Sequence, residues 1–383
     1  MTTPILELER VLAKRCGRRH CVVTGRGASA IYLALKALPA RGGKVIVPDI
    51  ICPSPATVPG YAGFEPLFCD VSLRDFNMDP QALKQLLETN DDVAAIMPVH
   101  LYGQPAPLHE IIQIASEYGI PVVEDAAQAL GGTYGGRMLG SWGDISIVSF
   151  GHTKTIDIGW GGAALTDNDA YANLMRIELL QLPSVSADIK RICEEYRNVY
   201  YSLIRLTELN PELHALFVPL PKIYKDMYLF TMEESKAGQI LVALESLGDL
   251  VHARRRHAHA YRAGLQHPAL HHPVQDDGAS PWRYSFLVGN GLQAQITQAL
   301  RDAGIDASNW YPPIHQWYQS GRAQNICLFK NATRVAREVV NLWVTPNLPA
   351  GQIERTCEIV HRVLARALPQ AFFYAGKLFR PQP

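Results

Sequence analysis

Residues 120–128 read IPVVEDAAQ, a short valine-rich run that ends in two adjacent carboxylates and an amide. A β-branched run of this length is typical of a buried strand. Because side chains alternate between the two faces of a strand, Glu124 and Asp125 cannot point to the same side. We therefore expect one carboxylate to face a ligand crevice, with Gln128 beside it on the following turn. Asp125 could instead serve only as the N-cap of a helix.

Similar runs alternate with helical patterns through the first 170 residues. The expected strands are 20–23, 44–47, 93–97, 145–148 and 163–165, and the expected helices are 28–38, 80–87 and 108–118. Strands joined by crossover helices form a mostly parallel sheet that is covered on both faces. Ligands of such sheets bind beyond the carboxyl ends of the strands, so we expect the functional residues in the loops that follow these runs.

The second half of the chain has a different pattern. It is mainly helical at 167–251, with a long helix at 233–264, followed by a strand at 284–288 and helices at 292–303 and 352–368. A chain of 383 residues is long enough for two domains. We predict an α/β protein with a large domain at 1–250 and a small C-terminal α+β domain at 251–383.

Composition and charge exclude several classes of protein. The chain is 48% hydrophobic and its 36 basic residues balance 36 acidic ones, so no net field attracts nucleic acid or an anionic membrane. Apolar stretches break within about ten residues, and Glu7 and Glu9 interrupt the N-terminal pattern, which argues against a membrane span and a secretion signal. Seven scattered cysteines without a C-x-x-C pair, and histidines without ligand spacing, argue against disulfides and metals. We predict a cytoplasmic enzyme without a metal.

A lysine follows the expected strand at 145–148, in the segment SFGHTK at 149–154. A lysine in an irregular loop at the edge of a parallel sheet is not needed for packing. If it is partly desolvated, it has the amine that a Schiff base with a carbonyl requires, although most lysines simply lie at the surface. Ser149 and nearby backbone amides could hold a phosphate. The loop TGRGAS at 24–29 could bind an anion or form an ordinary tight turn.

A phosphate cradle, an acid at one strand end and a lysine at a later one match the needs of pyridoxal phosphate. The motifs EDAAQ at 124–128, GSWGD at 140–144, VHLYGQP at 99–105, Ser149-Phe150 with Lys154, and Gly161-Gly162 resemble the DegT/DnrJ/EryC1/StrS aminotransferases. The resemblance is clear over residues 20–170 and continues weakly to YPPIH at 311–315. It implies a fold-type I enzyme, with a mostly parallel sheet of seven strands in the large domain and pyridoxal 5′-phosphate as the cofactor.

The resemblance also implies roles for individual residues. Lys154 would form the Schiff base and carry the transferred proton, and Asp125 would keep the pyridine nitrogen protonated. Gln128 would bond the phenolic oxygen of the cofactor. The phosphate would be held by Ser149 and by the loop residues Gly27, Ala28 and Ser29. Glutamate would be the amino donor, and a keto-sugar or related secondary-metabolite intermediate would be the acceptor. The family implies a homodimer with shared active sites.

Several positions depart from the family pattern. Cys52 stands where an aromatic residue usually stacks on the cofactor ring, so a polarizable contact remains but the aromatic pair is lost. Ala28 replaces a common threonine. Leu229 and Thr231 stand where the family usually has an asparagine and an arginine from the neighbouring subunit. The loss of these polar groups would weaken the binding of a phosphorylated substrate most, so a less charged acceptor is an alternative.

Two residues are candidates for substrate contact. Arg283 could bind the carboxylate of the amino donor in a bidentate pair, or could be a surface arginine at the start of a strand. His315 could approach the substrate, or could simply pack or cap. Two alternative functions remain: a PLP-dependent dehydratase or lyase, which a histidine in place of Lys154 would have favoured, and a non-catalytic PLP-binding homologue.

Overall fold

The computed structural model describes residues 2–40, 43–210, 213, 216–217, 219–318 and 329–367. In this part of the chain the main sheet has the strand order β1-β9-β8-β5-β4-β2-β3. The strands are β1 (His20–Thr24), β9 (Gly162–Thr166), β8 (Ile145–Ser149), β5 (Val123–Asp125), β4 (Val93–Ile96), β2 (Lys44–Pro48) and β3 (Glu65–Cys69). Parallel bridges from Ile96 to Val122 and from Val99 to Asp125 join the two halves. Among these strands β9 is antiparallel to its neighbours, so the predicted mostly parallel sheet is confirmed.

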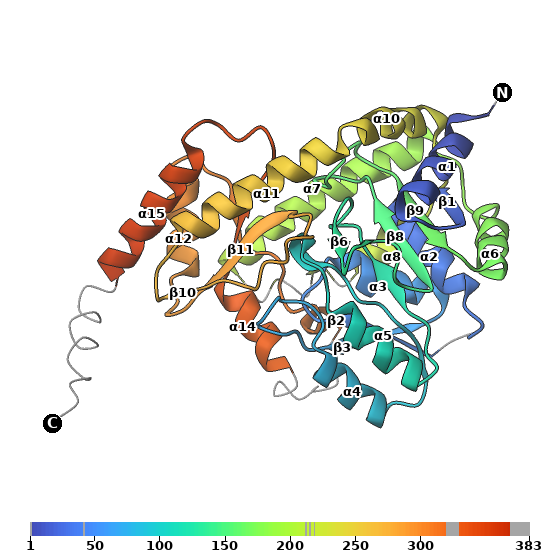
Figure 1. Cartoon of the computed structure of the whole chain (residues 1–383), viewed down its shortest axis with the longest axis horizontal. Helices are drawn as coiled ribbons and strands as arrows, with labels where there is room; N and C mark the ends of the chain where they lie inside the picture. Colours follow the sequence, from blue (N-terminus) through green and yellow to red (C-terminus); the bar gives the residue numbers. More distant parts are fainter. Residues whose placement is uncertain are drawn as a thin grey trace.

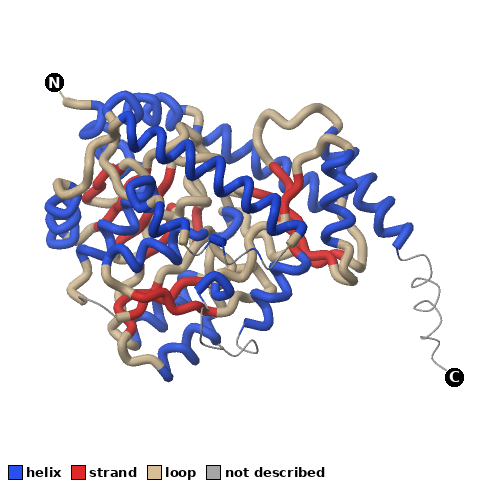
Figure 2. The backbone as a smooth tube through the Cα atoms, turned by 180° about the vertical axis from the view of Figure 1, so that it is seen from behind, coloured by secondary structure: helices blue, strands red, loops and turns tan. Residues whose placement is uncertain are grey.

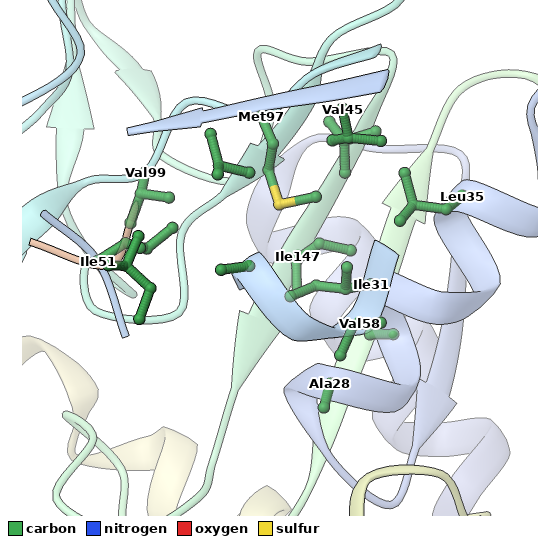
Figure 3. Packing of buried hydrophobic residues seen from close by; sticks show 14 of the residues in the cluster. Ala28, Ile31, Leu35, Val45, Ile51, Val58, Met97, Val99 and Ile147 are labelled. Atoms are coloured by element: carbon green, nitrogen blue, oxygen red, sulfur yellow. The ribbon is translucent and has the colours of Figure 1, made fainter. Parts of the chain in front are cut away.

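Helices cover both faces of this sheet because its strands are apolar on both sides. Val45 and Val47 of β2 belong to one core cluster and Ile46 belongs to the other, as the two-residue period of a strand requires. The first face carries α2 (Gly27–Ala37), α3 (Pro53–Ala62) and α6 (Asp169–Leu179); the second carries α1 (Pro4–Cys16), α4 (Pro80–Thr89), α5 (Leu108–Glu117) and α10 (Glu234–Glu245). Figure 2 shows the strands enclosed by helices. In Figure 3, Ala28 and Ile31 of α2 lie near Val58 of α3 and Ile147 of β8.

Local sequence explains where several helices begin. Asp79 is the N-cap of α4, since its Oδ1 accepts from the backbone N–H of Gln81 at 2.8 Å. Sequence patterns missed α3 and β3 because both contain proline. In α3, Pro53 and Pro55 lie in the first turn, where a missing N–H costs little. β3 contains Pro66 and lies at the edge of the sheet, where proline is tolerated.

The middle of the chain is helical, as predicted. It contains α7 (Ala187–Leu209), α8 (Leu220–Ile223), α9 (Lys225–Tyr228), α10 and α11 (Leu247–Gly264). The single helix predicted at 233–264 is wrong, since α10 and α11 are separate helices that meet at Ser246. Figure 1 shows α10 and α11 following each other across the molecule, from above the main sheet to the C-terminal part.

The C-terminal part is built on a second, antiparallel sheet. Its order is β10-β11-β13-β12, with β10 (Leu270–His271), β11 (Arg283–Val288), β13 (Val339–Trp343) and β12 (Ala307–Ser308). The end of α11, α12 (Gln293–Asp302) and α15 (Gln352–Ala367) share an apolar core with this sheet. The short helices α13 (His315–Tyr318) and α14 (Lys330–Glu338) pack toward the main core. Smaller elements are η1 (Leu101–Gly103) and the hairpin of β6 (Thr133–Tyr134) and β7 (Arg137–Met138).

α11 connects the two parts. Its residue Val251 belongs to the core of the main sheet, and its residue Ala258 belongs to the C-terminal core. The domain boundary at residue 250 stays a prediction. The last residue of the helix predicted at 352–368 lies outside the described residues. None of the described helices is long and apolar enough to cross a membrane.

Candidate functional site

The carboxyl ends of β4, β5 and β8 open into a cavity of about 1010 Å³. Its other walls come from the N-terminus of α2, one face of α7, and the C-terminal part around β11 and β13. The predicted site residues that line it are Gly27, Ala28, Cys52, Asp125, Gln128, Ser149, Lys154 and Arg283. The fold therefore brings together residues that lie up to 256 positions apart in the sequence. Ser29 and His315 are not part of the lining.

Lys154 lies in a tightly held loop after β8. Its predecessor Thr153 has φ of 66°, a left-handed conformation that is rare for a residue with a β-branched side chain. Two contacts hold this turn: Thr153 N–H donates to Asp157 Oδ2 at 2.8 Å, and Trp282 Nε1–H donates to the carbonyl oxygen of Thr153 at 2.6 Å. Within the described residues no carboxylate lies within 4.0 Å of Lys154 Nζ. Burial lowers the pKa of Lys154, while Asp125 opposes that shift.

Asp125 and Glu124 point to opposite sides of β5, as strand geometry predicts. Asp125 lines the cavity, and its Oδ1 accepts from the backbone N–H of Ala127 at 2.8 Å. Among the described residues, none donates a hydrogen bond to its Oδ2. Burial raises the pKa of Asp125, while Ala127 and Lys154 oppose that shift. The local bond to Ala127 closes a turn, and a second oxygen remains for a ligand.

Of the two adjacent carboxylates, Glu124 is the one with hydrogen bonds to both of its oxygens. Its carboxylate accepts from Gly140 N–H at 2.6 Å, from Trp142 N–H at 2.7 Å and from Ser146 Oγ–H at 2.7 Å. His100 Nε2 lies 3.0 Å from Glu124 Oε1. Burial by itself would raise the pKa of Glu124, but His100 and the hydrogen bonds lower it to about 2. Glu124 is therefore a structural anion that fixes the loop after β7 against β5.

Gln128 joins the sheet end to an aromatic stack. Its Oε1 accepts from the backbone N–H of Tyr102 at 2.9 Å, and its Nε2–H donates to the hydroxyl of Tyr311 at 3.4 Å. Tyr102 lies nearly parallel to Tyr311 and to Trp282, with ring centroids 6.2 and 6.4 Å away. The carboxamide faces the cavity. Its oxygen is used by Tyr102, whereas its Nε2–H makes only the longer contact to Tyr311 and is available to a ligand.

The N-terminus of α2 and Ser149 form an anion cradle. The first N–H groups of a helix have no intrahelical acceptor and attract anions. Gly27 lies so close to β8 that a Cβ there would be 3.1 Å from Ser149 Cβ and 3.2 Å from its Oγ. Glycine at this position therefore lets the first turn of α2 approach Ser149. The side-chain hydroxyl of Ser149 accepts a 3.3 Å hydrogen bond from Gly151 N–H.

Arg283 is the most deeply buried cation of the cavity wall. Its guanidinium carbon lies 4.0 Å from the ring centroid of Trp282 and 3.9 Å from that of Trp343. One Nη1–H donates to the carbonyl oxygen of Trp282 at 2.8 Å, whereas its buried Nε has no hydrogen-bond partner. Burial lowers its pKa to about 9. The described residues place no carboxylate within 4.0 Å, so Arg283 is not the surface arginine that the sequence left open.

Two predicted site residues lie elsewhere. His315 does not contact the cavity, because its Nδ1 is bonded to Asp49 Oδ2 at 2.6 Å and its ring stacks on Phe329. It fastens the segment after β12 to the end of β2, which corrects the predicted substrate contact. The side chain of Ser29 is buried, and its hydroxyl donates to the carbonyl oxygen of Tyr228 at 2.9 Å. The hydroxyl of Ser29 is therefore not available to a phosphate. Its backbone N–H lies in the first turn of α2, so the predicted phosphate contact of Ser29 stays a prediction for the backbone alone.

The segment at 228–231 packs against the loop that precedes α2. Phe230 accepts a 2.9 Å hydrogen bond from Gly25 N–H, and Thr231 N–H donates to the carbonyl oxygen of Pro183. Neither Leu229 nor Thr231 lines the cavity. The two positions that are usually polar in similar sequences thus contribute no side chain to the lining within this chain.

Sequence reasoning missed the wall that α7 provides. Its lining residues are Lys190, Cys193, Glu194, Tyr196, Arg197, Tyr200, Tyr201, Ile204 and Arg205. Their spacing of three and four residues is that of one helix face, so the helical period was a readable signal. The period alone does not show which residues this face contacts. In the structure Tyr200 lies 5.5 Å from Tyr196 and 5.8 Å from Trp310 between ring centroids.

No group of three or more histidine, cysteine, aspartate or glutamate side chains suited to a metal occurs among the described residues. The cavity itself offers Lys154, Asp125, the anion cradle and the buried Arg283.

Comparison with known proteins shows which family and which proteins this chain is similar to. The model of the DegT/DnrJ/EryC1/StrS aminotransferase family matches residues 3–361. GDP-perosamine synthase of Caulobacter vibrioides is 38% identical over 319 residues, which are 81% of this chain and 77% of that protein. UDP-2-acetamido-2-deoxy-3-oxo-D-glucuronate aminotransferase of Pseudomonas aeruginosa is 27% identical over 356 residues, which are 92% of this chain and 89% of that protein. The crystal structure of NtdA from Bacillus subtilis with bound cofactor PMP shares the fold, with a TM-score of 0.74 and 21% identity over 94% of this chain and 77% of that one.

Proposed function

The chain belongs to the DegT/DnrJ/EryC1/StrS aminotransferase family, and on that premise we propose that it moves an amino group from an amino acid to a keto-sugar. The family, the fold type and the aminotransferase class predicted from sequence are confirmed. Glutamate is the proposed donor, and a keto-sugar or a related secondary-metabolite intermediate is the proposed acceptor. The observation that carries the proposal is the convergence of Lys154, Asp125 and the anion cradle on one cavity.

Pyridoxal 5′-phosphate is the cofactor of this aminotransferase, and the cavity residues fit it. The fit rests on a buried lysine amine without an ion-pair partner among the described residues, on the unused oxygen of Asp125, and on the close approach of Gly27 to Ser149. When bound, the cofactor supplies an aldehyde that takes up an amine and a ring that withdraws electrons from the attached carbon.

Lys154 is the proposed attachment point. Its lowered pKa favours the neutral amine, which is the form that can attack an aldehyde or take a proton. After release from the cofactor, Nζ would move the proton that leaves the Cα of the amino donor. The strained and doubly anchored Thr153 keeps this amine in place.

The other lining residues would hold the cofactor in one orientation. Asp125 would share a proton with the ring nitrogen through its free oxygen. Gln128 would donate to the phenolic oxygen, and Cys52 would lie beside the ring. Ser149 and the N–H groups of Gly27, Ala28 and Ser29 would bind the phosphate at the start of α2.

Arg283 is proposed to bind the carboxylate of the amino donor. A guanidinium held between two indole rings keeps its planar edge available, and that edge matches a carboxylate in a bidentate pair. The absence of a carboxylate partner among the described residues leaves its charge to be neutralised by a ligand. An amino acid donor supplies that charge, and the burial of Arg283 excludes competing water.

The charge of the cavity supports an anionic acceptor. Its lining contains eight lysine and arginine residues and three aspartate and glutamate residues. Such an excess concentrates anions in the cavity. The named relatives act on sugars linked to GDP or UDP, and a nucleotide-linked keto-sugar would fit this charge. The aromatic face of α7 supplies stacking surfaces for an apolar or aromatic part of the acceptor.

The proposal includes a homodimer with shared active sites in a reducing cytoplasm. Large apolar side chains that a second copy could cover are Leu180 just after α6, Val242 of α10 and Ile223 of α8, which are 82%, 69% and 66% exposed. Six cysteines of the described part of the chain are free thiols. Light scattering should give twice the mass of the 383-residue chain, and an active monomer would contradict the shared site.

The test of the proposed function is an absorbance spectrum of the purified protein with pyridoxal phosphate, before and after glutamate. The proposal expects a visible band that glutamate converts to the pyridoxamine form, and a return of the band when the correct keto-sugar is added. Nucleotide-linked and free keto-sugars are then screened. A band that no amino donor changes would favour the eliminating or the non-catalytic alternative. Without any band, the proposed cofactor site is wrong.

A further inference from the structure

The phosphate end of the cavity has few polar side chains. Ala28 supplies no hydroxyl, and neither Leu229 nor Thr231 reaches the lining. The hydroxyl of Ser29 is used by the carbonyl oxygen of Tyr228. Ser149 and the first N–H groups of α2 remain as donors, and all of them are neutral. A phosphate dianion in a partly buried site needs a cation as well.

Arg26 lies at this end of the cavity. It is the N-cap residue of α2, with extended backbone angles, and its side chain is part of the cavity lining. Its Nη1 lies 2.8 Å from Met227 Sδ, and Cys193 lies against the same guanidinium. A thioether sulfur is a weak acceptor. The buried Nε of Arg26 has no hydrogen-bond partner.

Three other arginines have the carboxylate partner that Arg26 and Arg283 lack among the described residues. Arg18 Nη1 lies 2.8 Å from Asp167, and Arg176 Nη2 lies 2.9 Å from Glu9. Arg197, which also lines the cavity, lies 3.7 Å from Glu194. Arg26 has no carboxylate within 4.0 Å in the described part of the chain. Its charge is uncompensated beside a helix N-terminus that itself attracts anions.

We propose that Arg26 is the cationic ligand of the cofactor's phosphate group, beside Ser149 and the first N–H groups of α2. The proposal rests on the cofactor site described above. It makes phosphate recognition a property of the loop before α2 within one chain. Because Arg26 acts only on the phosphate, it distinguishes pyridoxal phosphate from pyridoxal, which has the same aldehyde and ring.

The experiment measures binding, not turnover. Apoprotein is titrated with pyridoxal phosphate and with pyridoxal, and the Kd of each is followed by tryptophan fluorescence. Arg26→Ala should raise the Kd of pyridoxal phosphate about 10- to 100-fold, the range expected for one lost charge-assisted contact. The Kd of pyridoxal should stay within about threefold of its original value. Arg26→Lys keeps the charge and should recover part of the loss.

The matched control is Arg197→Ala. It removes the same charge from the same cavity, but from a residue that already has Glu194 as a partner. The preference for pyridoxal phosphate over pyridoxal should remain as in the unchanged protein. Inorganic phosphate gives a second readout: it should raise the Tm of the unchanged apoprotein and of Arg197→Ala, and not that of Arg26→Ala.

Three outcomes would overturn the inference. Equal weakening of pyridoxal phosphate and pyridoxal by Arg26→Ala would mean that Arg26 only supports the fold. An unchanged Kd for both would mean that Arg26 does not reach the phosphate. If Arg26→Ala does not fold, the uncharged variant Arg26→Gln replaces it, and an unaltered preference for pyridoxal phosphate in that variant decides against the inference. Failure of the unchanged protein to bind either compound would instead overturn the proposed cofactor site itself.

Discussion

The two walls of the cavity are built in different ways. The sheet-end wall, residues 27–28, 125–128 and 149–154, consists of short loops that hydrogen bonds hold in place. The facing wall, residues 190–205 of α7 with 282–283, 310–311 and 343, consists of aromatic rings and cations. The difference indicates a division of work. The proposed function assigns the reaction that every substrate undergoes to the groups of the sheet-end wall, and the selection of substrates to the facing wall.

The largest expected effect is on the sheet-end wall. Lys154→Ala should abolish covalent attachment of the cofactor and lower turnover by about 10⁴-fold, since both the attachment and the proton transfer are lost. Absorbance measures the covalent attachment, and a coupled assay with glutamate measures turnover. Lys236→Ala is the control, because Lys236 lines the same cavity but donates to the carbonyl oxygen of Ile158. Equal losses in the two variants would remove the special role of Lys154.

Asp125→Asn should lower turnover by about 10²- to 10³-fold while the cofactor still binds, because an amide cannot keep the ring nitrogen charged. The local bond from Ala127 N–H can persist, since the asparagine oxygen accepts it as well. Stopped-flow measurement of the glutamate half-reaction gives the rate. Full activity would reduce Asp125 to a residue that only closes the turn with Ala127.

The neighbouring carboxylate should affect stability instead of the reaction rate. Glu124→Gln should cost about 3 kcal/mol, because an amide NH₂ would face the N–H donors that now surround the carboxylate. The pKa of Glu124 is about 2 in the folded protein, below its ordinary 4.5. Its contribution is therefore complete above pH 4.5 and lost as the pH falls toward 2. Urea unfolding at several pH values checks this.

The unchanged apoprotein should lose more stability between pH 4.5 and 2 than Glu124→Gln does. If the two pH profiles run parallel, the carboxylate is not the group that stabilises the fold in this range. A large change in the glutamate half-reaction at neutral pH would also contradict the assignment, since Glu124 points away from the cavity.

The smallest effect is expected on the facing wall. Arg283→Lys keeps the charge but loses the planar fork and the fit between Trp282 and Trp343, so the KM for the amino donor should rise about tenfold. The KM of the acceptor should change little. Steady-state kinetics with each substrate varied in turn separate the two constants. A rise confined to the acceptor would assign Arg283 to the other substrate.

The sheet-end wall could be predicted from sequence because its signals are local. A β-branched run followed by Glu124 and Asp125 predicts a strand end, and alternation predicts that only one of the two carboxylates faces the crevice. Lys154 follows a similar run. Helix α3 escaped prediction because its prolines argue against a helix, although its first turn tolerates them.

The facing wall could not be predicted, because it depends on packing between distant segments. The period of α7 shows a face but not what that face meets. Trp282 and Trp343 enclose Arg283 only because β11 pairs with β13 in one register. The sequence leaves His315 open between a substrate contact and a packing role, because its partner Asp49 is 266 residues away.

The most direct test of the account is to locate the covalently bound cofactor. Protein saturated with pyridoxal phosphate is reduced with borohydride and digested, and the modified peptide is identified by mass spectrometry. The account predicts one reduced cofactor per chain, attached to Lys154. Lys190 and Lys236 line the same cavity and are the alternatives that the structure offers. Attachment to either of them, with Lys154 unmodified, would contradict the account.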